Sequence, residues 1–347
     1  MSTEDEDIPP FEEELSVPPA PRAFAPAEMV ACEACLRANP PTRMNCLYCG
    51  ADLPVVDASN DLRRPTLRAL EVWEQGYNVV MLPQAIEQIS ADAITTAVQL
   101  LHVEAGQLRG MAEAQTPLPL ARAASRDEAS LVERKLRVAG WQVEIVADQD
   151  LAVETHAPKR IRKLKIGDDA LTGWTSAEGA AERVEWTRVE LLVTGHIARK
   201  RIEVEERRSR RAENEIVETR EFHDDESVLD LYLNASVVNW RIMAENFDYS
   251  CLGAEKKLLA TENFKHLVET FRTQAARAAY DDSYRSVRHY LKFAWPLAEQ
   301  TQAGNLKRLG PGRYNSEAVT SVTNERQFTR YGRLLHYFRS RQRPHAT

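Results

Sequence analysis

Two Cys-x-x-Cys pairs near the N terminus constrain the fold of this chain more than any other feature. They are Cys32 with Cys35 and Cys46 with Cys49, and ten residues separate the pairs. A Cys-x-x-Cys turn leaves both sulfurs on one side, so two such turns can present four thiolates to one tetrahedral metal ion. Four thiolates leave no open position for water, and we therefore predict one structural Zn²⁺ and no chemistry at the site. A redox dithiol is the alternative.

A module of this size needs its metal in order to fold. Residues 29–54 are too few to bury a core of their own, so the metal would supply most of the folding free energy. The chain has 5 cysteines, which is too few for a disulfide framework. The fifth, Cys251, is expected to be a lone buried thiol, because nothing in the sequence places a base such as His223 or His266 beside it.

The cysteine module resembles the short zinc ribbons of bacterial cytoplasmic proteins, which carry Asn-Pro between the knuckles and Gly after the last cysteine. Asn39, Pro40 and Gly50 fit that pattern. The spacing is also similar to that of the Ran-binding type zinc finger. Members of that family that read single-stranded RNA use a Trp two residues before the first cysteine, and Val30 stands there in this chain. The resemblance therefore implies a docking or stabilising module without an RNA-stacking platform.

Charge and hydropathy indicate a chain that is neither secreted nor membrane-spanning. The 45 basic and 52 acidic residues give a net charge of −7, and no apolar run approaches the roughly 18 residues of a membrane span. The acidic start lacks the basic and apolar pattern of a secretory signal. We expect residues 1–28 to be a disordered acidic, Pro-rich leader and the protein to be cytoplasmic, with peripheral membrane contact not expected.

The middle of the chain predicts a multi-domain α+β architecture. Residues 55–75 are expected to form a linker, and residues 76–150 a small α+β domain of ferredoxin-like type with the order β-α-(α)-β-α-β. The capping box Ser125-x-x-Glu128 predicts the start of its last helix, and Gly140 predicts that helix's end.

From Pro158 the pattern changes to consecutive strands followed by one amphipathic helix, predicted from Glu255 to Ala276. Seven short strands are expected, with Gly195 and the polar stretch 207–213 as turns between them. This element order across 158–276 weakly resembles a pleckstrin-homology-like small barrel closed by a helix.

Residues 277–347 are predicted to be an irregular extension that contains one short helix near 286–293 and ends in a basic, aromatic tail. Its aromatics could stack on bases while its arginines hold phosphates. The same residues could lie on an anionic lipid surface, or form a helix that packs onto the barrel. The candidate nucleic-acid-binding residues are Arg326, Arg330, Tyr331, Arg333 and Arg339.

The leading hypothesis is a non-enzymatic cytoplasmic adaptor that binds protein partners through the ribbon and the barrel, because the chain holds one closed metal site and no catalytic motif. The alternative is a nucleic-acid-binding protein that uses the tail, with an affinity that falls steeply as salt rises. A third hypothesis is an enzyme with unrecognised geometry. It predicts a concave pocket that contains carboxylates with perturbed pKa values.

Overall fold

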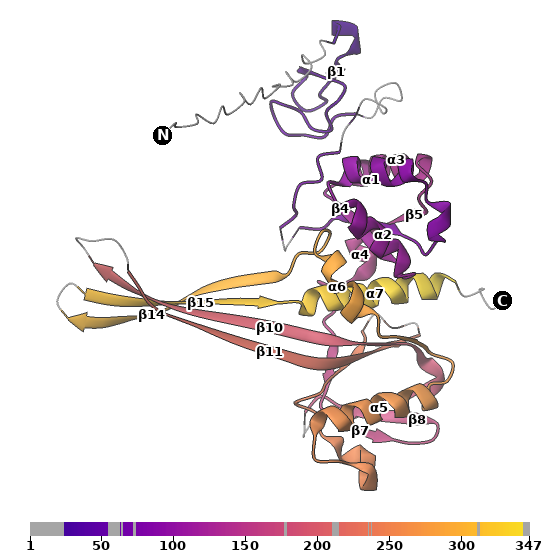
Figure 1. Cartoon of the computed structure of the whole chain (residues 1–347), viewed down its shortest axis with the longest axis vertical. Coiled ribbons are helices and arrows are strands. Elements are labelled where there is room, and N and C mark those ends of the chain that lie inside the picture. Colours follow the sequence, from indigo (N-terminus) through magenta and orange to yellow (C-terminus); the bar gives the residue numbers. More distant parts are fainter. Residues whose placement is uncertain are drawn as a thin grey trace, which may run out of the picture. The chain divides into compact units, whose positions relative to one another are not determined.

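The computed structural model describes residues 24–54, 63, 65–71, 74–176, 179–209, 215–234, 236, 238–310 and 313–342. The chain divides into two compact units, unit 1 (residues 1–64) and unit 2 (residues 65–347) (Figure 1). Most of the predicted leader and linker lies outside the described residues. None of the described helices combines the length and the apolar character that a bilayer crossing requires.

Unit 1 is a small module built around its cysteines. After the 3-10 turn η1 (Pro26–Glu28), the antiparallel strands β1 (Val30–Ala31) and β2 (Ala38–Asn39) carry the first Cys-x-x-Cys turn between them. The buried core consists of Val30, Cys32, Cys46 and Leu53. Two of the four core residues are therefore cysteines whose sulfurs belong to the candidate metal site.

Unit 2 opens with a three-stranded antiparallel sheet covered by helices, which confirms the mixed α+β class. The first strand lies at the centre of the order β4-β3-β5. A ferredoxin-like domain has four strands, so this arrangement is simpler than the expected one. The elements are β3 (Tyr77–Met81), η3 (Ile86–Gln88), α1 (Ala91–Leu101), α2 (Ala105–Glu113), β4 (Leu118–Ala123), α3 (Arg126–Val138), β5 (Val143–Ala147) and α4 (Asp148–Leu151).

Helix α3 begins at the predicted cap, although only half of the capping box forms. The Ser125 hydroxyl accepts the Glu128 N–H at 3.2 Å, as expected. The Glu128 carboxylate instead accepts the backbone N–H groups of Thr66 at 2.7 Å, Leu67 at 2.8 Å and Ala124 at 3.3 Å. The acidic residue thus fastens the segment before β3 to α3, a use that local spacing does not reveal.

The strand-rich part of unit 2 forms two sheets closed by a helix. β7, β8 and β9 make a three-stranded sheet, and the larger curled sheet has the order β14-β15-β10-β11-β12-β6, with β13 pairing to β10 in parallel. The elements are β6 (Lys159–Ile161), β7 (Lys163–Ile166), β8 (Ala170–Trp174), β9 (Glu182–Glu185), η4 (Trp186–Arg188), β10 (Val189–Ser209), β11 (Glu215–Leu233), β12 (Trp240–Met243), η5 (Tyr249–Glu255), α5 (Ala260–Gln274) and β13 (Ala279–Asp281).

Helix α5 starts later than the predicted Glu255. Asn263 accepts the Lys257 N–H at 2.7 Å and donates to the Lys257 carbonyl at 2.9 Å, which holds the preceding segment out of the helix. Leu258 and Leu259 therefore lie before the helix, within the predicted range, and are exposed. The apolar face of α5, from Phe264 to Phe271, is buried in a core that it shares with the neighbouring strands.

Strands predicted as separate are continuous, because Gly195 is not a turn. β10 and β11 pair in register from Leu191 opposite Tyr232 to Glu205 opposite Glu218, and after a register shift the pairing continues to Arg207 opposite Glu215. A Cβ built at Gly195 would lie 2.5 Å from the Phe328 ring and 3.0 Å from the Tyr284 ring. The glycine therefore lets a helix approach the sheet closely, which explains its presence within a strand. The predicted turn at 207–213 lies partly outside the described residues.

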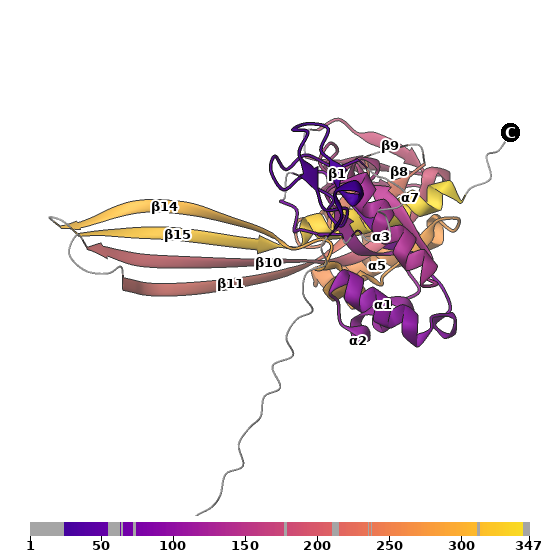
Figure 2. The same ribbon diagram turned by 90° about the horizontal axis from the view of Figure 1, so that it is seen from above.

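The described residues between 277 and 342 form mostly helices and strands rather than an irregular extension. β15 pairs antiparallel with both β14 and β10. The outer parts of β10, β11, β14 and β15 run together as a four-stranded arm that leads away from the helices of unit 2 (Figure 1 and Figure 2). The elements are α6 (Tyr284–Leu291), β14 (Ala298–Gly310), β15 (Arg313–Thr323) and α7 (Glu325–Arg341).

The inner halves of β10 and β11 separate two cores. Leu191, Val193 and Ile197 belong to a core that also contains the α+β layer, α6 and α7. Val189 and Leu192 belong to the second core, beneath α5. The predicted regions 76–150 and 158–276 are thus packed into one compact unit, with the C-terminal helices as part of the shared core.

A buried ion-pair network fastens α7 to the sheet. Asp230 on β11 accepts the Arg241 Nε–H and a second guanidinium N–H, both at 2.7 Å, and neither residue is more than 1% exposed. Asn239 donates to the same carboxylate at 2.9 Å. Arg241 also donates to the Thr329 hydroxyl at 2.9 Å and pairs with Glu325 at 3.2 Å, so both strand and helix depend on this guanidinium.

The start of α7 has a predictable pH dependence. Burial opposes ionisation of Glu325, but the charges of Arg241 and Arg160 outweigh it and hold its pKa below the ordinary value. A lowered folded-state pKa contributes stability above the unfolded pKa of roughly 4.3, and that stability is lost as pH falls through the folded pKa. Glu325→Gln should therefore lower the free energy of unfolding by about 1–2 kcal/mol at neutral pH.

Urea unfolding at neutral pH and at about pH 3 checks this expectation. The difference between wild type and Glu325→Gln should shrink in acid, while the exposed Glu299→Gln serves as a control that changes little at either pH. A difference that persisted unchanged at low pH would contradict a role for the Glu325 charge.

Candidate metal centre

The two Cys-x-x-Cys turns of unit 1 have the same backbone hydrogen bonds. In the first, Leu36 N–H donates to the Cys32 carbonyl at 2.8 Å and Cys32 N–H to the Arg37 carbonyl at 3.0 Å. In the second, Gly50 N–H donates to the Cys46 carbonyl at 3.0 Å and Cys46 N–H to the Ala51 carbonyl at 2.8 Å. Each turn is therefore a copy of the other, and each holds its two sulfurs in one direction.

The four sulfurs come together as the spacing predicts. The Cys32 and Cys49 sulfurs are 3.6 Å apart and the Cys35 and Cys46 sulfurs 3.5 Å apart, so each close pair joins the two turns. All four ligand atoms lie within 4.8 Å of one another. A tetrahedral zinc ion with bonds of about 2.3 Å requires sulfur separations of about 3.8 Å. The donor set could hold a metal ion and is compatible with zinc.

Hydrogen bonds prepare one of the sulfurs as a thiolate. Burial favours the neutral thiol of Cys46, but N–H groups of Tyr48, Cys49 and Asn39 donate to it and lower its pKa to about 6. The Ala51 N–H favours the Cys49 thiolate, yet the neighbouring sulfurs and burial outweigh it and raise the Cys49 pKa to about 12. Metal binding at neutral pH therefore displaces at least the Cys49 proton.

Asn39 connects the two turns. It is fully buried, and its amide donates to the Arg37 carbonyl at 2.8 Å and to the Cys46 sulfur at 3.5 Å. Its side-chain oxygen accepts the Leu47 N–H at 2.8 Å. The Cys-x2-Cys-x3-Asn spacing was the available signal, because it places this amide between the knuckles.

The exposed surface of unit 1 carries large apolar side chains. Leu36, Leu47 and Tyr48 are 81%, 53% and 57% exposed, and Arg37 lies 4.7 Å from the centre of the Tyr48 ring. Val30, which stands where RNA-reading fingers carry Trp, is buried in the module core. The side chain at that position therefore packs in the core and offers no surface on which a base could stack.

The tail residues lie on α7 and mostly face protein. Tyr331 is fully buried and donates to Asp281 at 2.9 Å, while Arg330 lies 3.8 Å from Asp148 and burial lowers its pKa to about 10. Arg333 donates to the Leu151 carbonyl at 3.0 Å. Arg339 donates to the Glu190 carbonyl at 3.1 Å, and Arg326 pairs with Glu154.

A stacking aromatic needs a free face, and Tyr331 has none in this conformation. Arg330 and Arg333 are each only 5% exposed. This arrangement agrees with the packed-helix alternative for the tail. The nucleic-acid hypothesis stays a prediction that would have to rest on the more accessible Arg326 and Arg339.

Neither Cys251 nor the carboxylate that best fits the enzyme hypothesis has the surroundings of a catalytic group. Burial raises the pKa of the Cys251 thiol to about 11, and the charged groups that act on this pKa are Asp248 and Lys256 rather than a histidine. Asp281, which borders a cavity of about 790 Å³, has its pKa raised by burial, as the enzyme hypothesis required of a carboxylate. Its oxygens, however, already accept hydrogen bonds from the Ser283 hydroxyl at 2.7 Å and from Tyr331. It therefore acts as a tie between β13 and α7.

A second group of possible ligands, Asp224, Glu226 and Glu245, lies on unit 2. Arg199 already pairs with Asp224 at 3.6 Å and with Glu226 at 3.5 Å, so two of the three carboxylates share a cationic partner. The cysteine set remains the better metal candidate.

No protein-family model, no curated protein and no solved structure matches this chain.

Proposed function

We propose that the chain is a non-enzymatic adaptor of the cytoplasm whose zinc-ribbon module, stabilised by one structural Zn²⁺, docks a protein partner. Four free cysteines that converge on one point suit a reducing compartment, where thiols persist. All four ligand positions of a tetrahedral ion would come from protein, which suits a structural ion rather than a reactive one.

The observation that carries the proposal is the conformation of Leu36. This leucine and Gly50 follow their respective Cys-x-x-Cys pairs, and both are left-handed, with φ of 59° and 75°. Glycine adopts that conformation freely, whereas a side chain there costs roughly 1–2 kcal/mol. Leu36 also exposes its apolar surface to water. Neither property helps the module to fold, so a partner that covers the leucine is the simplest reason for its presence.

Leu47 and Tyr48 extend the same argument to the second turn. Both are exposed, although the core of the module contains only four residues. Two large apolar side chains therefore contribute to the surface of the module rather than to its core. The Arg37 guanidinium over the Tyr48 ring adds a cationic, aromatic contact of the kind enriched at protein interfaces.

The test replaces Leu36 with glycine in the full chain and places a photo-crosslinking amino acid at Tyr48 in living cells. Leu36→Gly should keep its zinc and gain up to about 1 kcal/mol of module stability, since strain is relieved. The chain that keeps Leu36 should give a discrete crosslinked adduct with its partner, and Leu36→Gly should abolish that adduct.

Leu258→Gly provides the matched control, because it removes another fully exposed leucine, outside unit 1. It should leave the adduct intact. An adduct that survives Leu36→Gly, or the lack of any adduct in the starting chain, would dismiss docking through this surface.

A further inference from the structure

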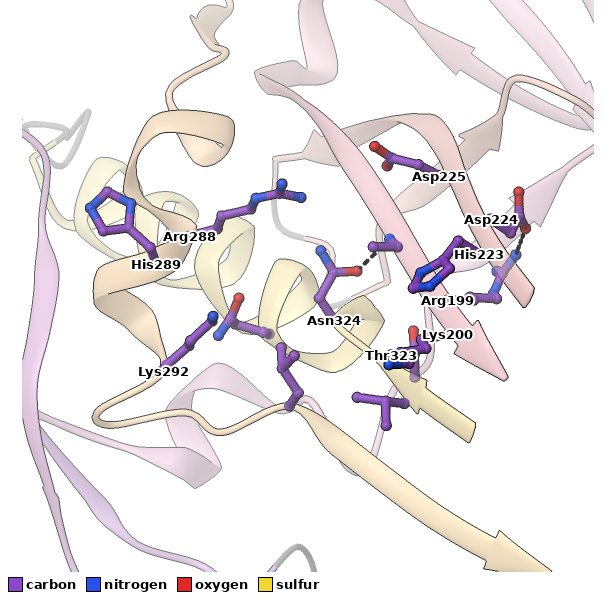
Figure 3. Close-up of a pocket in the computed structure, with 14 residues that line it drawn as sticks. Arg199, Lys200, His223, Asp224, Asp225, Arg288, His289, Lys292, Thr323 and Asn324 are labelled. Carbon is purple, nitrogen blue, oxygen red and sulfur yellow. Dashed lines mark hydrogen bonds and ion pairs between the residues drawn. The ribbon is translucent and has the colours of Figure 1, made fainter. Parts of the chain in front are cut away.

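A cavity of about 530 Å³ lies in unit 2 between α6 and the strands at the base of the arm. Figure 3 shows Arg288 and Lys292 extending from the α6 side toward Asn324, across from the strand pair β10 and β11. The charged residues that line it are Arg199, Lys200, Asp224, Asp225, Arg288 and Lys292. Positive charges outnumber negative ones here, although the chain as a whole carries −7.

The acidic residues of the lining already have partners. Asp224 pairs with Arg199 at 3.6 Å, and Asp225 lies 3.5 Å from the His196 ring. On the basic side, Lys200 pairs with Glu221 at 3.0 Å. The strand side of the cavity is therefore close to neutral, and its carboxylates are engaged with their own neighbours.

Arg288 and Lys292 are different. In the part of the chain that the structure describes, neither side chain forms an ion pair with a carboxylate. They are four residues apart, at the end of α6, so their like charges repel at a cost of a few tenths of a kcal/mol. The C-terminal end of a helix favours cations, but it supplies no counter-charge that could contact both. The two cationic side chains are therefore available to bind an anion together.

The floor of the cavity is rigid and neutral. Asn324 is 4% exposed, accepts the Ala198 N–H at 2.8 Å and donates to the His196 carbonyl at 3.0 Å. Gln327 is 3% exposed and donates to the Trp295 carbonyl at 2.8 Å. Because these side chains are held by the fold, a ligand would bind a surface that needs little ordering, which favours affinity.

We propose that this cavity binds a small phosphorylated molecule, with the phosphate between Arg288 and Lys292. An arginine can hold two phosphate oxygens at once, and a lysine adds a second positive charge. The volume falls within the roughly 300–1,000 Å³ of small-molecule sites and exceeds that of one oxyanion, so it leaves room for the rest of the molecule. Lys200 and His289 also belong to the lining, and Lys200 is already paired with Glu221.

The experiment is a calorimetric titration of the full, metal-loaded chain with inorganic pyrophosphate at low ionic strength. The double variant Arg288→Ala with Lys292→Ala should weaken binding at least about tenfold, since it removes two charge-assisted contacts. The matched control is Arg285→Ala with Lys265→Ala. It removes the same net charge from exposed positions outside the lining and should change the affinity by less than about twofold.

The other arms separate this site from general attraction to anions. Sulfate at equal ionic strength should bind more weakly than pyrophosphate, and a single-stranded oligonucleotide should not bind more tightly. Equal losses in both double variants, equal affinity for sulfate, or a marked preference for the oligonucleotide would each overturn the proposal. Lack of pyrophosphate binding by the wild-type chain would overturn it directly.

Discussion

Replacing Cys32 and Cys49 with serine is expected to remove one equivalent of zinc per chain and to unfold residues 26–54. Only four side chains form the core of that module, and two of them are ligand cysteines. Structural zinc contributes about 10–16 kcal/mol to small cysteine modules, which is more than such a core can replace. Elemental analysis of the purified protein gives the metal content, and amide NMR signals from the module report its folding.

Unit 2 should remain folded in the same variant, because its cores contain no residue of unit 1. Cys251→Ser is the control, since that thiol lies in unit 2 and should leave the metal in place. Iron in place of zinc, or a module that stays folded without metal, would contradict the structural-zinc interpretation and direct attention to redox chemistry at the four cysteines.

Replacing Asp230 with alanine should have the largest effect on unit 2. The carboxylate is fully buried and accepts four donors, from Arg241 twice, from Asn239 and from Tyr232 at 3.3 Å. Its removal leaves the Arg241 charge buried, with Glu325 as its remaining charged partner. Breaking a buried pair from one side costs about 3–5 kcal/mol, which is a large part of the stability of a typical domain.

Urea unfolding of the full chain, followed by a signal from unit 2, measures this loss. Asp225→Ala on the same strand is the matched control. That carboxylate is 58% exposed, and its removal should cost less than about 0.5 kcal/mol. The double change Asp230→Leu with Arg241→Met should recover part of the loss, because neither buried charge remains. If Asp230→Ala costs no more than Asp225→Ala, the network does not hold α7 to the sheet.

The candidate metal centre could be read from the sequence because its geometry is local. The four ligands lie between Cys32 and Cys49, and the bonds that orient each sulfur close within six residues. The start of α3 was readable for the same reason, since Ser125 accepts an N–H three residues ahead. The exposure of Leu36 was not readable, because it depends on what the module leaves uncovered.

The surroundings of Gly195 and of the C-terminal tail could not be predicted from local sequence patterns. A glycine between two apolar runs has the same local signature whether the chain turns there or a helix packs against it, and only the position of Phe328 distinguishes the two. The arginines and aromatics of α7 likewise have one composition whether they face nucleic acid, lipid or protein. Their burial is set by the α+β layer and by β10, which lie far away in the sequence.

The sequence by itself determined the mixed α+β class, the four converging cysteines and the start of α3, because these follow from contacts between residues a few positions apart. The tertiary structure decided that β10 and β11 are continuous, that α7 is buried and that Arg288 and Lys292 share a cavity. Those outcomes depend on which surfaces meet when distant segments pack. The hydrophobic effect is non-directional, so an apolar side chain does not by itself indicate which distant segment will cover it.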